Sequence, residues 1–218
     1  MRWRTGRRSS NIEDRRGTRV RGGAVKGGIG TVVVVLALSY FLGIDPQVLF
    51  QLQQAGGPTT TQTDYQPTAK EQEQAEFVSV VLADTEDTWS AIFRKAGYDY
   101  EEPKLVLFTG QVTSACGMAS AAMGPFYCPG DKKVYIDLAF FDDLQRRHGA
   151  PGDFAQAYVI AHEVGHHVQN LLGTSTEVRK AQRGLGKESA NDLSVKLELQ
   201  ADCFAGLWGN HADRSRQV

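Results

Sequence analysis

The sequence predicts an α+β domain with two long helices and a small β-sheet, preceded by one transmembrane helix. Three observations lead to this prediction. A His-Glu-x-x-His run lies at residues 162–166, an acidic pair lies on a separate helical segment near residue 200, and residues 27–44 carry no charge. The 218 residues suffice for one domain of ordinary size plus accessory segments.

Residues 1–26 form a basic tail. Nine of them are Lys or Arg and two are acidic, so the tail carries a net charge of +7 and the rest of the chain −8. A segment with many charges and few apolar residues is expected to be disordered. Such asymmetry indicates a tail with its own role. Nucleic-acid binding is the less favoured interpretation, because the next segment offers a simpler one.

Residues 27–44 (GGIGTVVVVLALSYFLGI) are an uncharged apolar run. As a helix rising about 1.5 Å per residue, the run spans about 27 Å, close to the roughly 30 Å of a bilayer core. The positive-inside rule then places residues 1–26 in the cytoplasm and the later residues outside, as in a single-pass membrane protein. A cleaved signal peptide and a buried segment of a soluble domain are the alternatives.

Residues 45–70 contain three prolines, a Gly-Gly pair and many Gln and Thr, which is typical of a linker. The predicted catalytic domain therefore covers residues 71–218. Apolar residues recur at helical spacing over residues 71–96, and two runs rich in β-branched and aromatic residues, 104–109 and 133–138, are predicted strands.

Cys116 and Cys128 lie in a loop rich in Gly, Ser, Ala and Pro between the two predicted strands. The predicted topology places this loop outside the cytoplasm, where disulfides persist, so we expect a Cys116–Cys128 bridge. Cys203 is left over. We expect it to be a buried small apolar residue, with a cysteine beyond residue 218 as the alternative partner.

The His-Glu-x-x-His run lies on a helix that Asp153 is expected to cap and Gly173 to end. Positions i and i+4 lie on one face of a helix, so His162 and His166 can aim their ring nitrogens at one point. Zinc binds such nitrogens at about 2.0–2.1 Å. Glu163 can reach a water at the metal as a general base, so the pattern is a metalloprotease signature.

Glu198 and Asp202 share one face of a second predicted helix, residues 190–208. Glu198 can be the third zinc ligand, and Asp202 can accept the outer N–H of a ligand histidine. Two His and one Glu leave a fourth position open, which is typical of a catalytic zinc site. His167 points away from this site, and His211 could approach a developing oxyanion.

Several segments carry a family resemblance. They are AHEVGHHVQN (161–170), ELQADCFAG (198–206), SACG (114–117), GPFYCP (124–129) and VYID (134–137). Together they resemble the bacterial, membrane-anchored "putative neutral zinc metallopeptidase" family, of the gluzincin-type zincins. The resemblance covers the chain from about residue 77 to its end, together with the layout of the N-terminal part, and implies a zincin-like fold.

By this resemblance His162, His166 and Glu198 are the metal ligands and Glu163 is the catalytic acid and base. Asp202 orients a ligand. The resemblance also offers Val134–Asp137 as an edge strand that pairs with substrate, with an ordinary core strand as the alternative. Family members continue beyond the position of Val218, so we expect the domain to be incomplete at its C-terminus.

These expectations describe a membrane-anchored zinc metallopeptidase that hydrolyses peptide bonds. Its substrate is a protein or peptide, Zn²⁺ is its only cofactor, and it binds neither nucleic acid nor a small-molecule cofactor. Two alternatives remain open at this point. One is a zinc amide hydrolase that acts on cell-wall material, and the other is a non-catalytic binding module that contains zinc.

Overall fold

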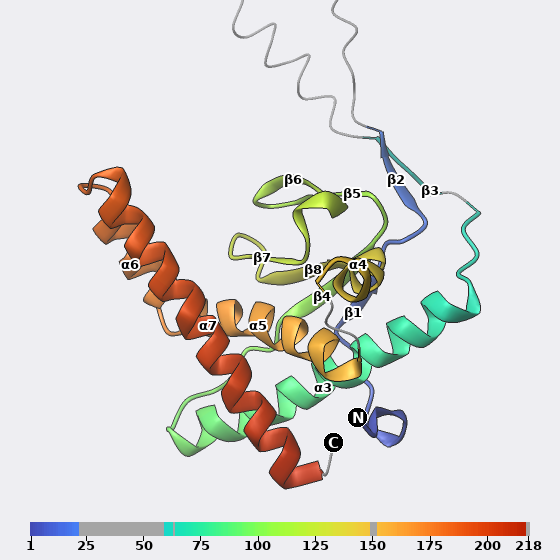
Figure 1. Ribbon diagram of the computed structural model, residues 1–218, viewed down its shortest axis with the longest axis horizontal. Coiled ribbons are helices and arrows are strands. Elements are labelled where there is room, and N and C mark those ends of the chain that lie inside the picture. The colour runs from blue at the N-terminus through green and yellow to red at the C-terminus, as the bar shows by residue number, and fades with distance from the viewer. Residues whose placement is uncertain (22–58, 63, 149–151, 217–218) are drawn as a thin grey trace, which may run out of the picture. The chain divides into compact units, whose positions relative to one another are not determined.

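A computed structural model of the chain describes residues 1–21, 59–62, 64–148 and 152–216 (Figure 1). The chain divides into two units, Met1–Gly17 with Tyr65–Val218, and Thr18–Asp64. In the smaller unit, strands β2 (Thr18–Arg21) and β3 (Thr59–Gln62) pair antiparallel. All other described elements belong to the larger unit, which contains the candidate site.

A four-stranded sheet with the order β1-β4-β8-β7 forms the centre of the larger unit. Its strands are β1 (Ile12–Asp14), β4 (Lys104–Phe108), β8 (Lys133–Asp137) and β7 (Phe126–Cys128). β1 and β8 run parallel to β4, and β7 runs antiparallel to β8. β4 and β8 confirm the strands predicted at 104–109 and 133–138.

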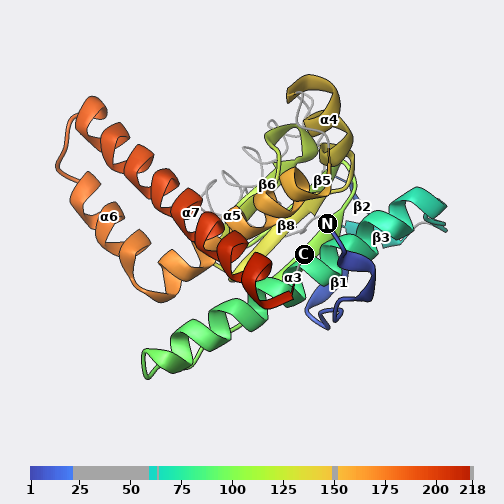
Figure 2. The same cartoon turned by 60° about the horizontal axis from the view of Figure 1, so that its bottom comes forward.

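Neighbouring side chains along a strand point to opposite faces of the sheet. In this sheet both faces are buried, each in its own apolar core. Leu105 and Leu107 of β4 enter one apolar core, together with residues of α3 (Ala69–Lys95), α5 (Asp153–Leu171) and α7 (Lys187–Arg216). Val106 and Phe108 enter a second core beneath the hairpin of β5 (Gln111–Ser114) and β6 (Gly117–Ser120). Helices therefore cover one face of the sheet and the hairpin covers the other (Figure 2).

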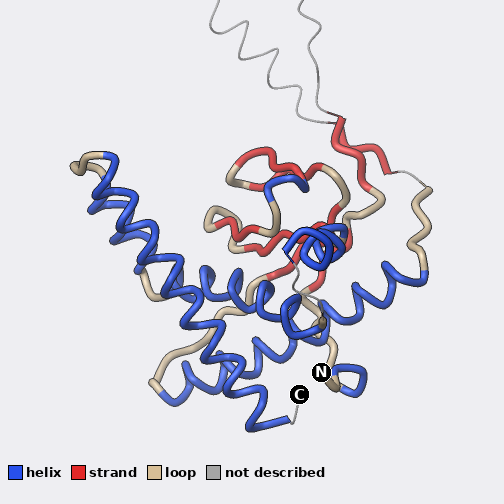
Figure 3. The backbone as a smooth tube through the Cα atoms, viewed as in Figure 1, coloured by secondary structure: helices blue, strands red, loops and turns tan. Residues whose placement is uncertain are grey.

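Figure 3 shows the helices in blue, and local sequence signals mark the start of α3 and the ends of α3 and α5. Thr68 and Glu71 form a capping box at the start of α3, and Gly97 follows its end with φ 82°. α4 (Ala139–His148) follows β8, and α6 (Thr174–Gln182) connects α5 to α7. Gly173 ends α5 as predicted, with φ 80°, whereas Asp153 is the first residue of that helix and does not cap it.

Residues 1–17 of the basic tail are part of the folded larger unit. Trp3, in the short helix η1 (Trp3–Thr5), is 7% exposed and packs edge-on against Phe77, with ring centroids 5.4 Å apart. β1 forms one edge of the sheet. The tail arginines pair with carboxylates of α3: Arg4 with Glu73, Arg7 with Glu86 and Asp87, and Arg8 with Glu76. Arg15 and Arg16 pair within the tail, with Glu13 and Asp14. The expectation of a disordered tail is therefore wrong for residues 1–17.

The predicted membrane topology is overturned. The segment 27–44 itself lies outside the described residues. No helix in the described part of the chain combines the length and the apolar character needed to cross a bilayer. In addition, β1 hydrogen-bonds with β4 in one sheet, so residues 12–14 lie on the same side of any membrane as the rest of the domain. A cytoplasmic tail joined by a single pass to a domain outside the membrane does not fit this pairing.

Candidate metal centre

The site forms where α7 crosses α5 (Figure 1). Gly165 of α5 lies at this crossing. A Cβ added to it would lie 3.0 Å from the Ala201 carbonyl oxygen and 3.2 Å from the Ala201 Cα of α7. Such distances are closer than side chains normally tolerate, so the missing side chain lets the two helix backbones approach. This close approach places α7 side chains over the His-Glu-x-x-His run.

Three predicted ligands converge at this crossing. Glu198 Oε2 lies 3.3 Å from His162 Nε2 and 3.3 Å from His166 Nε2. One donor atom from each of the three residues lies within 4.8 Å of the other two. Glu198 is more than thirty positions away in the sequence, so its placement beside the two histidines is a tertiary result that no local pattern guarantees.

Hydrogen bonds fix the orientation of His162. Its Nδ1 lies 2.9 Å from Asp202 Oδ1, which also accepts a hydrogen bond of 3.0 Å from the Tyr158 hydroxyl. An ionised carboxylate only accepts, so Nδ1 carries the proton. The Nε2 of the neutral ring is then left as an acceptor that faces Glu198. This contact gives Asp202 the position that the sequence predicted.

His166 is held in the same way by a residue that the sequence analysis missed. Its Nδ1 lies 2.9 Å from Oε1 of Gln169, which is fully buried. The signal was present in the spacing, since Gln169 follows His166 by three positions and thus shares its helix face. Because the amide oxygen accepts the Nδ1 proton, the Nε2 of the neutral His166 ring also faces Glu198 as an acceptor.

The donor set and its spacing fit a zinc ion. With neutral rings, two nitrogen lone pairs and one carboxylate oxygen meet, and a cation is what such a group of acceptors can hold. Two ligands at about 2.0–2.1 Å from one ion at a tetrahedral angle are about 3.3–3.4 Å apart. Both nitrogen-to-oxygen separations, 3.3 Å each, match this value. His162, His166 and Glu198 are the residues that would hold the ion.

Glu163 lies beside the convergent group and is 8% exposed. Burial raises the pKa of its carboxyl to about 7, and the Glu198 carboxylate adds to this rise. A backbone hydrogen bond from Tyr127 acts on the pKa in the opposite direction, as does the charge of His166 when its ring is protonated. A carboxyl in this position can exchange a proton near neutral pH.

An open cleft of about 420 Å³ gives access to these residues. Its floor is the helix α5. One wall is strand β7 with the residues beside it, and the other is formed by α6 and α7. The lining residues are Pro125, Phe126, Tyr127, Pro129, His162, Glu163, His166, Ser175, Arg179, Leu197 and Glu198.

His167 points away from the convergent group, as predicted, and connects α5 to the cleft wall. Its Nε2 lies 2.6 Å from the Glu101 carbonyl oxygen and must therefore donate. Its Nδ1 then accepts the Tyr127 hydroxyl proton over 3.0 Å, and Asn170 Nδ2 donates to that hydroxyl oxygen over 3.2 Å. Burial lowers the pKa of His167. The network attaches β7 to α5.

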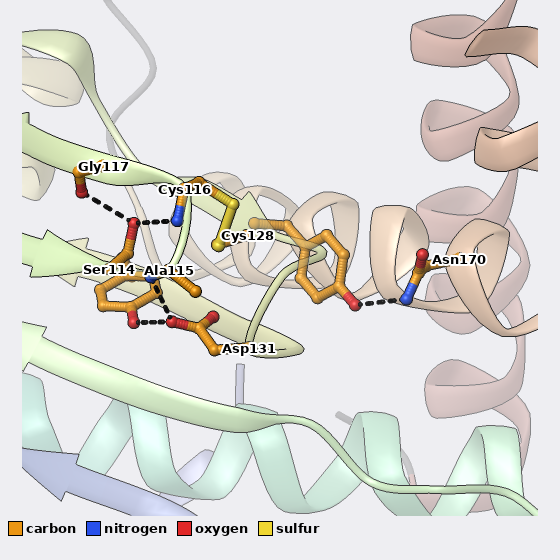
Figure 4. The surroundings of a disulfide bond; sticks show 9 residues. Ser114, Ala115, Cys116, Gly117, Cys128, Asp131 and Asn170 are labelled. Atoms are coloured by element: carbon orange, nitrogen blue, oxygen red, sulfur yellow. Dashed lines mark hydrogen bonds between the residues drawn. A yellow bond between two sulfur atoms is a disulfide. The ribbon is translucent and has the colours of Figure 1, made fainter.

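The predicted Cys116–Cys128 disulfide is present, with a Cα–Cα distance of 5.8 Å (Figure 4). It ties the end of β7 to the turn of the β5–β6 hairpin. Cys203 is exposed, so the expectation of a buried residue is wrong. His211 lies within α7, about 20 Å along the helix from Glu198, and is too distant to stabilise an oxyanion at the site.

The predicted substrate-pairing strand also needs correction. Val134–Asp137 belongs to β8, which lies between β4 and β7 and therefore is not an edge strand. Val134, Tyr135 and Ile136 are almost completely buried, as expected of a core strand. In the described part of the sheet, the edge on the side of the cleft is β7.

Comparison with known proteins gives a family and two groups of relatives. A family model described as "Putative neutral zinc metallopeptidase" matches residues 1–218. The protein named "Uncharacterized protein YpfJ" of Escherichia coli K12 is 48% identical over 222 residues, which cover 96% of this chain and 75% of that protein. "Uncharacterized protein Rv2575" of Mycobacterium tuberculosis H37Rv is 44% identical over 142 residues, 65% of this chain and 47% of that protein. No solved structure matches the chain.

Proposed function

Because the chain belongs to the "Putative neutral zinc metallopeptidase" family, we propose that it is a zinc-dependent peptidase that hydrolyses peptide bonds. His162, His166 and Glu198 would hold the ion. One observation carries this proposal: three acceptor atoms from two helices converge, and each histidine is fixed through Nδ1 so that its Nε2 faces the common point. An open cleft beside this point supports catalysis rather than a purely structural role.

Zinc at this site would supply Lewis-acid activation of the attacking water and of the scissile carbonyl. Glu163 would accept the proton that water loses as its oxygen bonds to the carbonyl carbon. The same carboxyl would deliver a proton to the amine nitrogen as the carbon–nitrogen bond breaks. Glu198 would offset part of the charge of the ion. Burial of Glu163 among the cleft residues supports this assignment.

β7 is the strand on which we place an extended substrate. It ends the described sheet, and Phe126 and Tyr127 line the cleft. An edge strand has unpaired backbone groups, to which a peptide backbone can hydrogen-bond.

The experiment combines metal analysis with hydrolysis assays on the whole chain. We expect one zinc per chain after dialysis and cleavage of an unstructured protein such as casein. Glu163→Gln should keep the zinc and lose hydrolysis, because the amide cannot accept the proton of water. Glu177→Gln, which makes the same change on the outer side of α6 where Glu177 pairs with Lys180, is the matched control and should retain both properties.

Three results would count against the proposal. A Glu163→Gln protein with near-normal turnover would remove Glu163 as the base. Bound zinc without any hydrolysis by the unaltered chain would indicate a binding module. Cleavage of cell-wall fragments but not of casein would indicate a zinc amide hydrolase with a different substrate.

A further inference from the structure

Gln169 is a fully buried polar residue that bridges the two helices of the site. Its Oε1 contacts His166 Nδ1 over 2.9 Å. Its Nε2 contacts the Leu197 carbonyl oxygen over 2.6 Å and Gln200 Oε1 over 3.1 Å. One side chain of α5 thus reaches both a predicted zinc ligand and the backbone of α7.

The contacts determine which end of the amide is which. The Leu197 carbonyl oxygen can only accept, so the amide atom beside it must be the nitrogen. The amide oxygen therefore faces His166, and His166 Nδ1 must donate. The position of Gln169 leaves the neutral His166 ring one tautomer, with Nε2 unprotonated and directed at Glu198.

The hydrogen bond at the α7 end of the bridge also affects the predicted zinc site. Leu197 directly precedes Glu198, so the bond to its carbonyl holds the turn of α7 that presents the third ligand. Asp202 forms the complementary connection, because it projects from α7 to hold His162 of α5. Asp202 of α7 thus orients His162, and Gln169 of α5 orients His166. Through the Leu197 carbonyl, Gln169 also fixes the position of Glu198 relative to α5.

We propose that Gln169 is a positioning residue that sets the His166 tautomer and the register of Glu198 together, and thereby raises the zinc affinity of the site. This inference rests on the zinc site of the proposed function. An amide suits this task because it offers an acceptor at one end and a donor at the other, which a carboxylate or an apolar side chain does not. Groups that orient metal ligands typically change metal affinity by about 10–100-fold when they are removed.

The chain contains a matched control. Gln182 of α6 also donates its amide to α7, to the Ala190 carbonyl oxygen over 2.8 Å and to Ser194 Oγ over 2.9 Å. It bridges helices as Gln169 does but contacts no predicted ligand. If a hydrogen bond between two helices were enough to affect zinc binding, replacing either glutamine would lower the zinc affinity by the same factor.

The test compares Gln169→Met and Gln182→Met with the unaltered chain. Methionine has nearly the length and volume of glutamine, so little space is opened. Zinc dissociation constants are measured by competition with a chromogenic chelator, and unfolding of the zinc-free proteins is measured in parallel. We expect zinc affinity to fall about 10–100-fold in Gln169→Met and to stay unchanged in Gln182→Met. Nitrogen-15 shifts of the His166 ring should show loss of the hydrogen-bonded Nδ1 proton in Gln169→Met alone.

Equal zinc affinity in the unaltered chain and in Gln169→Met would overturn the inference, and so would an equal loss in both glutamine variants. If Gln169→Met does not fold without zinc, the zinc concentration that restores half of the folded protein replaces the chelator assay, since binding stabilises by mass action. Failure of the proposed function is distinguishable: an unaltered chain that binds zinc tightly but cleaves nothing would leave the role of Gln169 intact.

Discussion

At the scale of single residues, Gly165 decides how closely α5 and α7 approach. It lies between the two predicted ligand histidines in sequence and faces Ala201 of α7. Three of the distances on which the site depends, from Glu198 to each histidine and from Asp202 to His162, join atoms of different helices. A small shift of α7 would therefore lengthen all of them together.

Gly165→Ala should weaken zinc binding. The new methyl group would lie 3.0 Å from the Ala201 carbonyl oxygen, a backbone atom that can move only with its helix. Gly206→Ala on α7 is the control, since its Cβ would meet no atom within 4 Å. That change should stabilise the protein by about 0.5–1 kcal/mol, because alanine favours helix. Chelator competition and thermal unfolding measure both effects, and unchanged zinc affinity in Gly165→Ala would show that α7 accommodates the methyl group.

The candidate ligands were easier to find in the sequence than Gly165 and Gln169. A spacing of four residues on a helix singles out His162 with His166 and Glu198 with Asp202, but it does not show that the two pairs lie together. Gly165 and Gln169 act through contacts with α7. The sequence of one helix does not show where a second helix crosses it. Gln169 shares a face with His166, yet only the position of the Leu197 carbonyl shows what its amide does.

At the scale of elements, β7 is a short strand held from two directions. On one side the disulfide ties Cys128 to Cys116 in the β5–β6 turn, and on the other Asn170 of α5 donates to the Tyr127 hydroxyl (Figure 4). Strands of three residues have little stability of their own. We therefore expect the position of this cleft wall to depend more on the disulfide and on the Asn170 hydrogen bond than on the pairing of β7 with β8.

Replacing both Cys116 and Cys128 by serine should loosen this wall. The bridge closes a loop over a sequence separation of 12, for which the chain-entropy estimate is a loss of about 3 kcal/mol of folding stability. We expect KM for a peptide substrate to rise more than kcat falls, because β7 is the strand proposed to bind substrate, whereas the predicted metal ligands lie on α5 and α7. Cys203→Ser is the control, since its thiol is exposed and free. Denaturant unfolding and steady-state kinetics test both statements, and an unchanged KM would separate β7 from substrate binding.

The strands show where sequence patterns stop being informative. The runs at 104–109 and 133–138 contain enough β-branched and aromatic residues to be recognised. β1 and β7 have only three residues each, and the order β1-β4-β8-β7 depends on pairings between distant segments. The assignment of Val134–Asp137 as an edge failed for this reason, since the identity of a strand's neighbours is a property of the sheet.

At the scale of the larger unit, the first seventeen residues belong to the domain that carries the site. Composition alone suggested a separate tail, because the many arginines give it a high positive charge. Three of them, Arg4, Arg7 and Arg8, pair with carboxylates spaced along α3, more than sixty residues later in the chain. Net charge per segment does not reveal such pairing, which explains why the tail was misassigned.

Substitutions of Arg7 and Arg4 can measure how much the ion pairs between the tail and α3 stabilise the domain. Arg7 contacts Glu86, whose side chain is 1% exposed, whereas the Arg4–Glu73 pair is exposed at 76% and 51%. Arg7→Ala should cost about 1–3 kcal/mol of unfolding free energy, since the buried Glu86 carboxylate loses its charged partner and, among the described residues, keeps the Ser9 and Asn11 side chains as donors. Arg4→Ala should cost about 0–1 kcal/mol. Urea unfolding of the two variants tests the difference, and equal costs would mean that Arg7 is no more important than a surface charge.

The parallel pairing of β1 with β4 also fixes a sequence of events during biosynthesis. Ile12 lies opposite Leu105, so a ribosome must have released more than a hundred residues before the earliest strand can meet its neighbour. Contacts between such distant positions form slowly, because a long loop must close first. The first strand of the sheet therefore cannot pair until β4 has been made.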